Sequence, residues 1–72
     1  MAIVIPLKSW REARLLTQQE LSVRAGVSEA AIVRIEKGNP ARISTVRKLL
    51  GALDMDVAVL GVLHGGTDRP NN

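Results

Sequence analysis

The chain has 72 residues, enough for one domain, and carries a net charge of +3. It contains no cysteine and one histidine, which excludes a disulfide framework, a thiolate metal site and a histidine cluster within one chain. Residues 24 to 48 include six basic and two acidic side chains, whereas those after Lys48 include three acidic and one basic. This distribution is typical of a protein with one face against a polyanion, although a solvated basic face would also produce it.

The apolar segments are too short to cross a membrane. The longest, Val57 to Leu63, is interrupted by Gly61 and falls well below the roughly 20 residues that a span needs. The N-terminal MAIVIP has no basic region and too little apolar length for a signal peptide. We therefore expect a soluble, cytoplasmic protein.

Three helices are predicted in the first half of the chain. After the short β-branched stretch AIVI, Pro6 suits the start of a helix over residues 7 to 14. The second helix begins after Thr17, which forms a capping box with Glu20, and ends at Gly26, because glycine readily adopts the left-handed conformation. Ser28 is the N-cap of the third helix, which ends at Gly38.

In the second half of the chain, the sequence predicts one more helix and then a strand. The fourth helix, over about residues 44 to 53, has its apolar stripe at Val46, Leu49, Leu50 and Leu53. The segment DMDVAVLGVL alternates acidic and apolar residues and is rich in valine, which favours a strand over residues 55–63. A helix is the alternative, because apolar residues also recur there every three positions. We expect residues 64–72 to be a disordered tail.

The third helix has two different sides when its residues are placed at roughly 100° intervals. One side, with Ala31, Ile32 and Ile35, is expected to be buried. The opposite side consists of small and charged residues: Glu29, Ala30, Val33, Arg34 and Lys37. Small side chains allow a helix to approach another surface closely, and the DNA major groove is wide enough to admit a helix.

Each residue type on that side matches a feature of base edges. The guanidinium of Arg34 matches the two acceptors of guanine, Ala30 or Val33 can contact a thymine methyl, and Glu29 can accept from a cytosine amino group. An ordinary amphipathic helix with a solvated polar face is the alternative interpretation of this segment alone.

Residues 7 to 57 resemble the lambda-repressor-like, or Xre, helix-turn-helix family. The matching residues are Gln18, Leu21, Gly26, Val27, Ser28, Ile32, Ile35, Glu36, Gly38 and Leu53. The resemblance implies a mainly α bundle of four or five helices in which the third is the recognition helix. It also implies base-reading positions at Ser28, Glu29, Ala30 and Arg34, phosphate contacts at Gln18, Lys37 and Arg42, and a structural ion pair of Arg11 with Glu36.

Two residues depart from the family pattern. Ser22 stands where the family usually has alanine, and its hydroxyl is expected to bond back to the preceding turn of the helix. Glu29 is less common at a base-reading position than glutamine or arginine, because an acid there needs a donor or is repelled by phosphate.

The run from Ile35 to Val59 looks like HipB-type antitoxins, in which a short strand pairs across a dimer. This implies one domain over residues 1–63 that forms a homodimer, with AIVI covering another strand edge. Pairing would also remove an aggregation hazard, since a valine-rich edge strand without proline or lysine is otherwise exposed. The predicted dimer-strand residues are Met55, Val57, Val59, Leu60 and Leu63.

The predicted function is a sequence-specific repressor that binds an inverted-repeat operator as a dimer. The likeness to antitoxins implies that it represses its own promoter and holds a toxin, such as a HipA-type kinase. A free-standing or phage-type repressor and a protein-interaction module that does not read DNA are the alternatives. We expect no enzyme activity, metal or cofactor, because His64 has no nucleophile or acid pair near it in the sequence.

Overall fold

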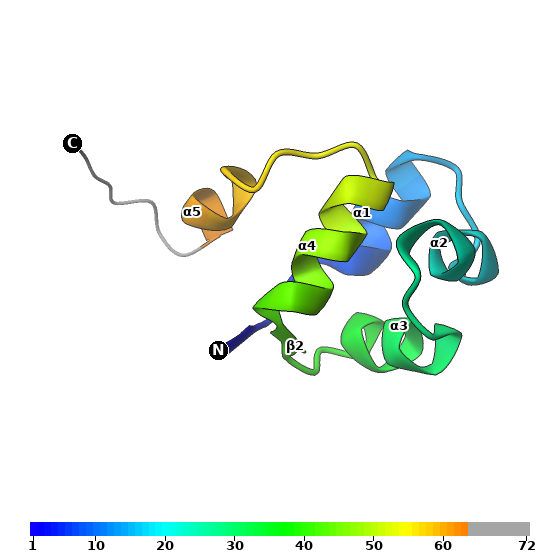
Figure 1. Ribbon diagram of the computed structural model, residues 1–72, viewed down its shortest axis with the longest axis horizontal. Helices are drawn as coiled ribbons and strands as arrows, with labels where there is room; N and C mark the ends of the chain where they lie inside the picture. The colour runs from blue at the N-terminus through cyan, green and yellow to red at the C-terminus, as the bar shows by residue number, and fades with distance from the viewer. Residues whose placement is uncertain (64–72) are drawn as a thin grey trace.

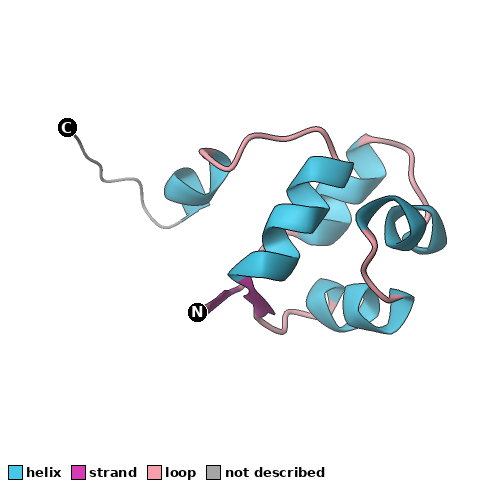
Figure 2. Ribbon diagram, in the orientation of Figure 1, coloured by secondary structure: helices cyan, strands magenta, loops and turns pink. Residues whose placement is uncertain are grey.

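The computed structural model describes residues 1–63, which form five helices and a two-stranded sheet (Figures 1 and 2). The predicted mainly helical bundle is therefore confirmed. In chain order the elements are β1 (Ala2–Ile3), α1 (Leu7–Ala13), α2 (Gln18–Ala25), α3 (Glu29–Glu36), β2 (Ala41–Arg42), α4 (Ile43–Ala52) and α5 (Val59–Leu63).

Helices α1 to α4 pack around one apolar core. Helix α2 contacts both α3 and α4, and α3 also contacts α1. In Figure 1, α4 runs in front of α1, while α2 and α3 lie together at one end of the bundle. The core is made of the buried side chains of Ile3, Ile5, Leu7, Leu16, Leu21, Ile32, Ile35, Ala41, Val46, Leu49, Leu50 and Leu53. All four residues of the predicted α4 stripe belong to it.

The stretch AIVI forms its strand pair within the chain. Ala2 pairs with Arg42 and Ile3 with Ala41 in an antiparallel ladder, and the Ile43 N–H donates to the Met1 carbonyl at 3.1 Å. This ladder ties the N-terminal segment to the start of α4 and buries Ile3. Sequence reasoning assigned AIVI to a strand edge but not to this partner.

The predicted C-terminal strand is wrong, because residues 59–63 form helix α5. The Asp56 side chain accepts a hydrogen bond from the Ala58 N–H at 2.8 Å, and the backbone then continues in turns, with the Val59 N–H donating to the Asp56 carbonyl. This acidic residue therefore starts a helix instead of alternating along a strand.

The residues assigned to a dimer strand differ in exposure where the structure describes their side chains. Val57 is 54% exposed. Leu63 is the last residue of α5. The other three, Met55, Val59 and Leu60, are partly buried against the core of their own chain. The predicted tail, residues 64–72, lies outside the described residues.

Candidate nucleic-acid interface

Helix α3 presents the predicted small and charged face to solvent. Glu29, Ala30, Arg34 and Lys37 are exposed, as is the N-cap residue Ser28, whereas Val33 is half-buried. On the opposite side Ile32 is fully buried and Ile35 is 5% exposed. Ala31, which we expected to be buried, is only half-buried because it lines a surface hollow. The face proposed to read bases is thus open to an approaching surface.

A tight turn sets the direction in which α3 leaves α2. Gly26 ends α2 in the left-handed conformation, with φ at 66°, and the Ser28 hydroxyl accepts a hydrogen bond from the Ala31 N–H at 3.2 Å. The Ser22 hydroxyl donates to the carbonyl of Val27 at 2.6 Å. The expected bond of Ser22 to the preceding turn is therefore replaced by one that reaches forward and fastens α2 to the turn before α3.

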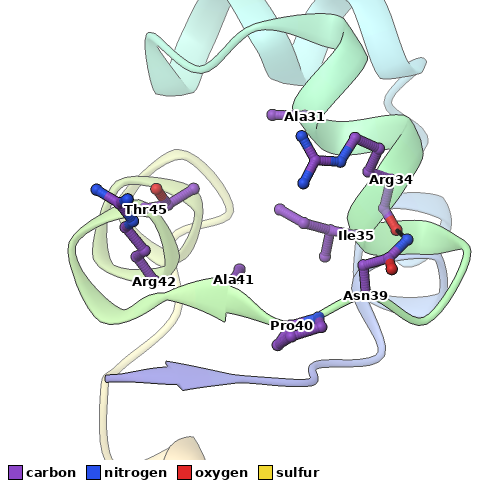
Figure 3. Close-up of a pocket in the computed structure, with 8 residues that line it drawn as sticks. All are labelled: Ala31, Arg34, Ile35, Asn39, Pro40, Ala41, Arg42 and Thr45. Atoms are coloured by element: carbon purple, nitrogen blue, oxygen red, sulfur yellow. Dashed lines mark hydrogen bonds between the residues drawn. The ribbon is translucent and has the colours of Figure 1, made fainter.

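A hollow of about 310 Å³ separates α3 from the start of α4. Arg34 enters it from α3, while Arg42 and Thr45 lie on the α4 side, so two cations flank one concavity (Figure 3). Asn39 shapes its edge by donating from its side-chain amide to the Arg34 carbonyl at 2.9 Å. Neither arginine has a side-chain acceptor among the hydrogen bonds of the described residues.

The predicted ion pair joins α1 to the end of α3. The guanidinium of Arg11 donates to both carboxylate oxygens of Glu36, at 2.6 Å from Nε and 3.1 Å from Nη2, and to the Leu16 carbonyl at 2.7 Å. Gln18, predicted to bind phosphate, joins this network because its Nε2 donates to Glu36 Oε1 at 3.0 Å. Residues far apart in sequence are thus held at the point where α1, α2 and α3 meet.

A profile of the helix-turn-helix family matches residues 7–60, which is most of the chain. The chain belongs to the helix-turn-helix family. A search of curated proteins finds no match to it. Helix-turn-helix proteins of this Xre-like type are DNA-binding transcription regulators, so the resemblance stated from the sequence is confirmed at this level.

In this helix-turn-helix domain the carboxyl group of Glu36 is held in its ionised form. Burial opposes ionisation, but hydrogen bonds from Arg11 and Gln18 and the charges of Arg11 and Lys8 outweigh it, so the pKa of Glu36 lies below its usual value. The hydrogen bond to Glu36 likewise raises the pKa of Arg11. Since the negative charge of Glu36 is neutralised within the domain, it does not oppose a polyanion as an exposed acid would.

The capping box at the start of α2 also lowers the pKa of an acidic residue, Glu20. The Thr17 N–H donates to Glu20 Oε1 at 2.8 Å, and the Glu20 N–H donates to the Thr17 hydroxyl at 3.0 Å. Hydrogen bonds from the Thr17 backbone and side chain lower the pKa of Glu20. This box fixes the first turn of α2 beside Gln18.

Two features of the site were not predicted from the sequence. One is the hydrogen bond between Gln18 and Glu36, and the other is the position of Arg34 and Arg42 on either side of one hollow. Both depend on how helices pack, and no local pattern reports that packing. The signal available was that Gln18 and Glu36 both match the family pattern, which places each residue but not their contact.

Within residues 1–63, no helix has the length and apolar character that crossing a membrane requires.

Proposed function

We propose that this helix-turn-helix protein is a sequence-specific transcriptional repressor that places α3 in the DNA major groove. The observation that carries the proposal is the exposed face of α3, where small and cationic side chains stand opposite the buried Ile32 and Ile35. Arg34 is proposed to read a guanine edge. Ser28, Glu29, Ala30 and Val33 are proposed to contact neighbouring bases.

Phosphate contacts are proposed for three residues around this helix. Arg42 lies across the hollow from Arg34, Lys37 follows α3 directly, and Gln18 stands at the start of α2, where helix N–H groups favour anions. Such contacts release counterions, so affinity for DNA should fall steeply as salt is raised.

We further propose that the protein binds an inverted repeat as a homodimer. Two copies related by a two-fold axis would present two α3 helices to successive major grooves about 34 Å apart. The segment after α4 supports this because Val57 is more than half exposed and α5 carries no charged residue. In this proposal, helical and turn residues of that segment form the contact.

An antitoxin that represses its own promoter is the finer form of the proposal. Its support is the sequence likeness of residues 35–59 to HipB-type antitoxins, together with the exposed apolar side chains of Leu15 and Val23, which are 91% and 78% exposed. A cytoplasmic protein partner, for example a HipA-type kinase, would use such surfaces. Co-purification with the product of the neighbouring gene tests this role, and failure of any toxin to associate leaves a free-standing or phage-type repressor.

Arg34→Ala tests the reading of bases. A base-reading arginine should cost about 1–3 kcal/mol of binding free energy when removed and relax specificity at one base pair. Arg47→Ala is the matched control, because Arg47 is exposed on α4 and does not line the hollow. Equal, sequence-independent losses in both variants would contradict base reading, and no loss in either would favour a protein-interaction module.

A further inference from the structure

We propose that Glu36 is a positioning residue for DNA binding, which holds the amide of Gln18 in the orientation that meets a phosphate. The inference rests on the proposed function, but its evidence is separate. Gln18 Nε2 lies 3.0 Å from Glu36 Oε1, although the two residues come from opposite ends of the helix-turn-helix unit. A residue assigned to a structural ion pair thus also contacts a residue of the proposed phosphate site.

The chemistry of the contact fixes which way the amide faces. An ionised carboxylate can only accept hydrogen bonds, so the NH₂ group of Gln18, and not its oxygen, must face Glu36. Arg11 holds both oxygens of that carboxylate through its planar guanidinium, and the side chains of Arg11 and Glu36 are only 12% and 6% exposed. The acceptor is therefore immobile, and one N–H of Gln18 remains available to an incoming anion.

The first turn of α2 supplies further donors beside that N–H. The first four N–H groups of a helix have no partner within it. Counted from the N-cap, two of the four are satisfied by the capping box, since the Thr17 N–H donates to Glu20 Oε1 and the Glu20 N–H donates to the Thr17 hydroxyl. The backbone N–H groups of Gln18 and Gln19 remain, so a phosphate at the start of α2 would meet two backbone donors and the oriented side-chain amide.

Positioning and simple electrostatics predict opposite effects when Glu36 is removed. Removal of Glu36 leaves the positive charge of Arg11 without its partner, so the protein becomes more cationic and electrostatics alone should strengthen binding. Loss of an orienting acceptor should weaken binding, because the amide of Gln18 then rotates freely between several conformations. A weaker complex after removal of an acid therefore cannot be a charge effect.

The test is a double-mutant cycle in DNA affinity, measured on the full chain with selected operator DNA at fixed salt. Glu36→Met removes the acceptor, Gln18→Met removes the donor, and a third protein carries both changes. Glu12→Met is the control, because Glu12 is an exposed acid of α1 whose charge also acts on Arg11, whereas the Gln18 amide donates to Glu36 and not to Glu12. Should Glu36→Met not fold, Arg11→Lys replaces it in the cycle, since lysine keeps the charge but cannot hold both carboxylate oxygens in one plane.

The expected result is a loss of about fivefold to tenfold in affinity for Glu36→Met, about the same loss for Gln18→Met, and little further loss in the double variant. Arg11→Lys should give a smaller loss that also disappears when Gln18 is methionine. Glu12→Met should bind as tightly as the unaltered protein or tighter. Independent losses from Gln18→Met and Glu36→Met, or tighter binding by Glu36→Met, would overturn the inference while leaving DNA binding intact. Failure of the unaltered protein to bind any DNA would overturn the proposed function itself.

Discussion

Replacing Leu15 with glycine should stabilise the protein. Leu15 ends α1 with a φ of 58°, in the left-handed region, and its side chain is 91% exposed. Its N–H donates to the Glu12 carbonyl at 3.0 Å and the next N–H to the Arg11 carbonyl at 3.2 Å, which is the pattern of a glycine-terminated helix end. Leucine therefore occupies a position whose backbone favours glycine.

The size of the effect follows from three contributions. A left-handed conformation costs an L-residue about 1–2 kcal/mol, which glycine avoids. The buried tenth of the leucine side chain contributes only about 0.2 kcal/mol, given about 1.5–3 kcal/mol for a fully buried leucine. Glycine also gives the unfolded chain more conformational entropy, which reduces the gain in stability by about 0.5 kcal/mol. The net gain should be about 0.3–1.3 kcal/mol, or a rise in Tm of about 2–9 °C for a domain of this size.

Urea and thermal unfolding, followed by circular dichroism, measure this gain directly. Leu15→Ala is the matched control, because it removes the same exposed side chain but keeps the Cβ atom that the left-handed conformation disfavours. We expect the alanine variant to be as stable as the unaltered protein and the glycine variant to exceed both. The reasoning would be refuted by equal stabilities of the alanine and glycine variants.

Three further predictions concern other parts of the domain. Because the pKa of Glu36 is lowered on folding, its ionised form stabilises the protein above its unfolded pKa of about 4.3, and this contribution is lost as the pH falls through the lower folded value; acid unfolding should show a shallower pH dependence in Glu36→Gln, and an unchanged slope would contradict the assignment. Ser22→Ala should lose about 1 kcal/mol from its hydrogen bond to Val27 and regain about 0.5 kcal/mol from the helix propensity of alanine, a net decrease measurable by urea unfolding; a more stable variant would speak against the bond. Arg42→Ala should weaken binding to all DNA sequences alike and reduce the slope of log affinity against log salt by about 0.9, which titrations at several salt concentrations will show; a change in base preference would instead make Arg42 a base-reading residue.

The helix boundaries were predictable where a local residue determines them. Thr17 and Ser28 cap α2 and α3, and Gly26 and Gly38 adopt positive φ angles at their ends, because capping depends on neighbours within four residues. The ends of α1 and α4 carry no such signal. They are left-handed at Leu15 and Asp54. Aspartate adopts this conformation more readily than leucine, but neither residue is the glycine that usually marks a helix end in a sequence.

The segment after α4 was predicted wrongly for a related reason. A valine-rich sequence forms a strand only when another strand pairs with it, and within residues 1–63 the two strands β1 and β2 pair with each other and not with this segment. Val59 and Leu60 instead pack against the core from a helix. The competition between local propensity and available partners is a tertiary effect that the residues alone do not report.

In the candidate site, too, features set by local sequence were predictable and features set by helix packing were not. The exposed face of α3 was predictable because helical periodicity separates Ile32 and Ile35 from the polar residues. The partner of Gln18 was not, because its contact with Glu36 exists only once α1, α2 and α3 have packed together.

Selection of bound sequences from a random pool of double-stranded DNA tests most directly whether the exposed side of α3 reads bases. We predict enrichment of an inverted repeat whose half-sites are centred about one helical turn apart, or a multiple of it, and loss of preference at one position of each half-site in Arg34→Ala. A pool that stays random after repeated selection at moderate salt, or a motif that Arg34→Ala enriches unchanged, would contradict the account.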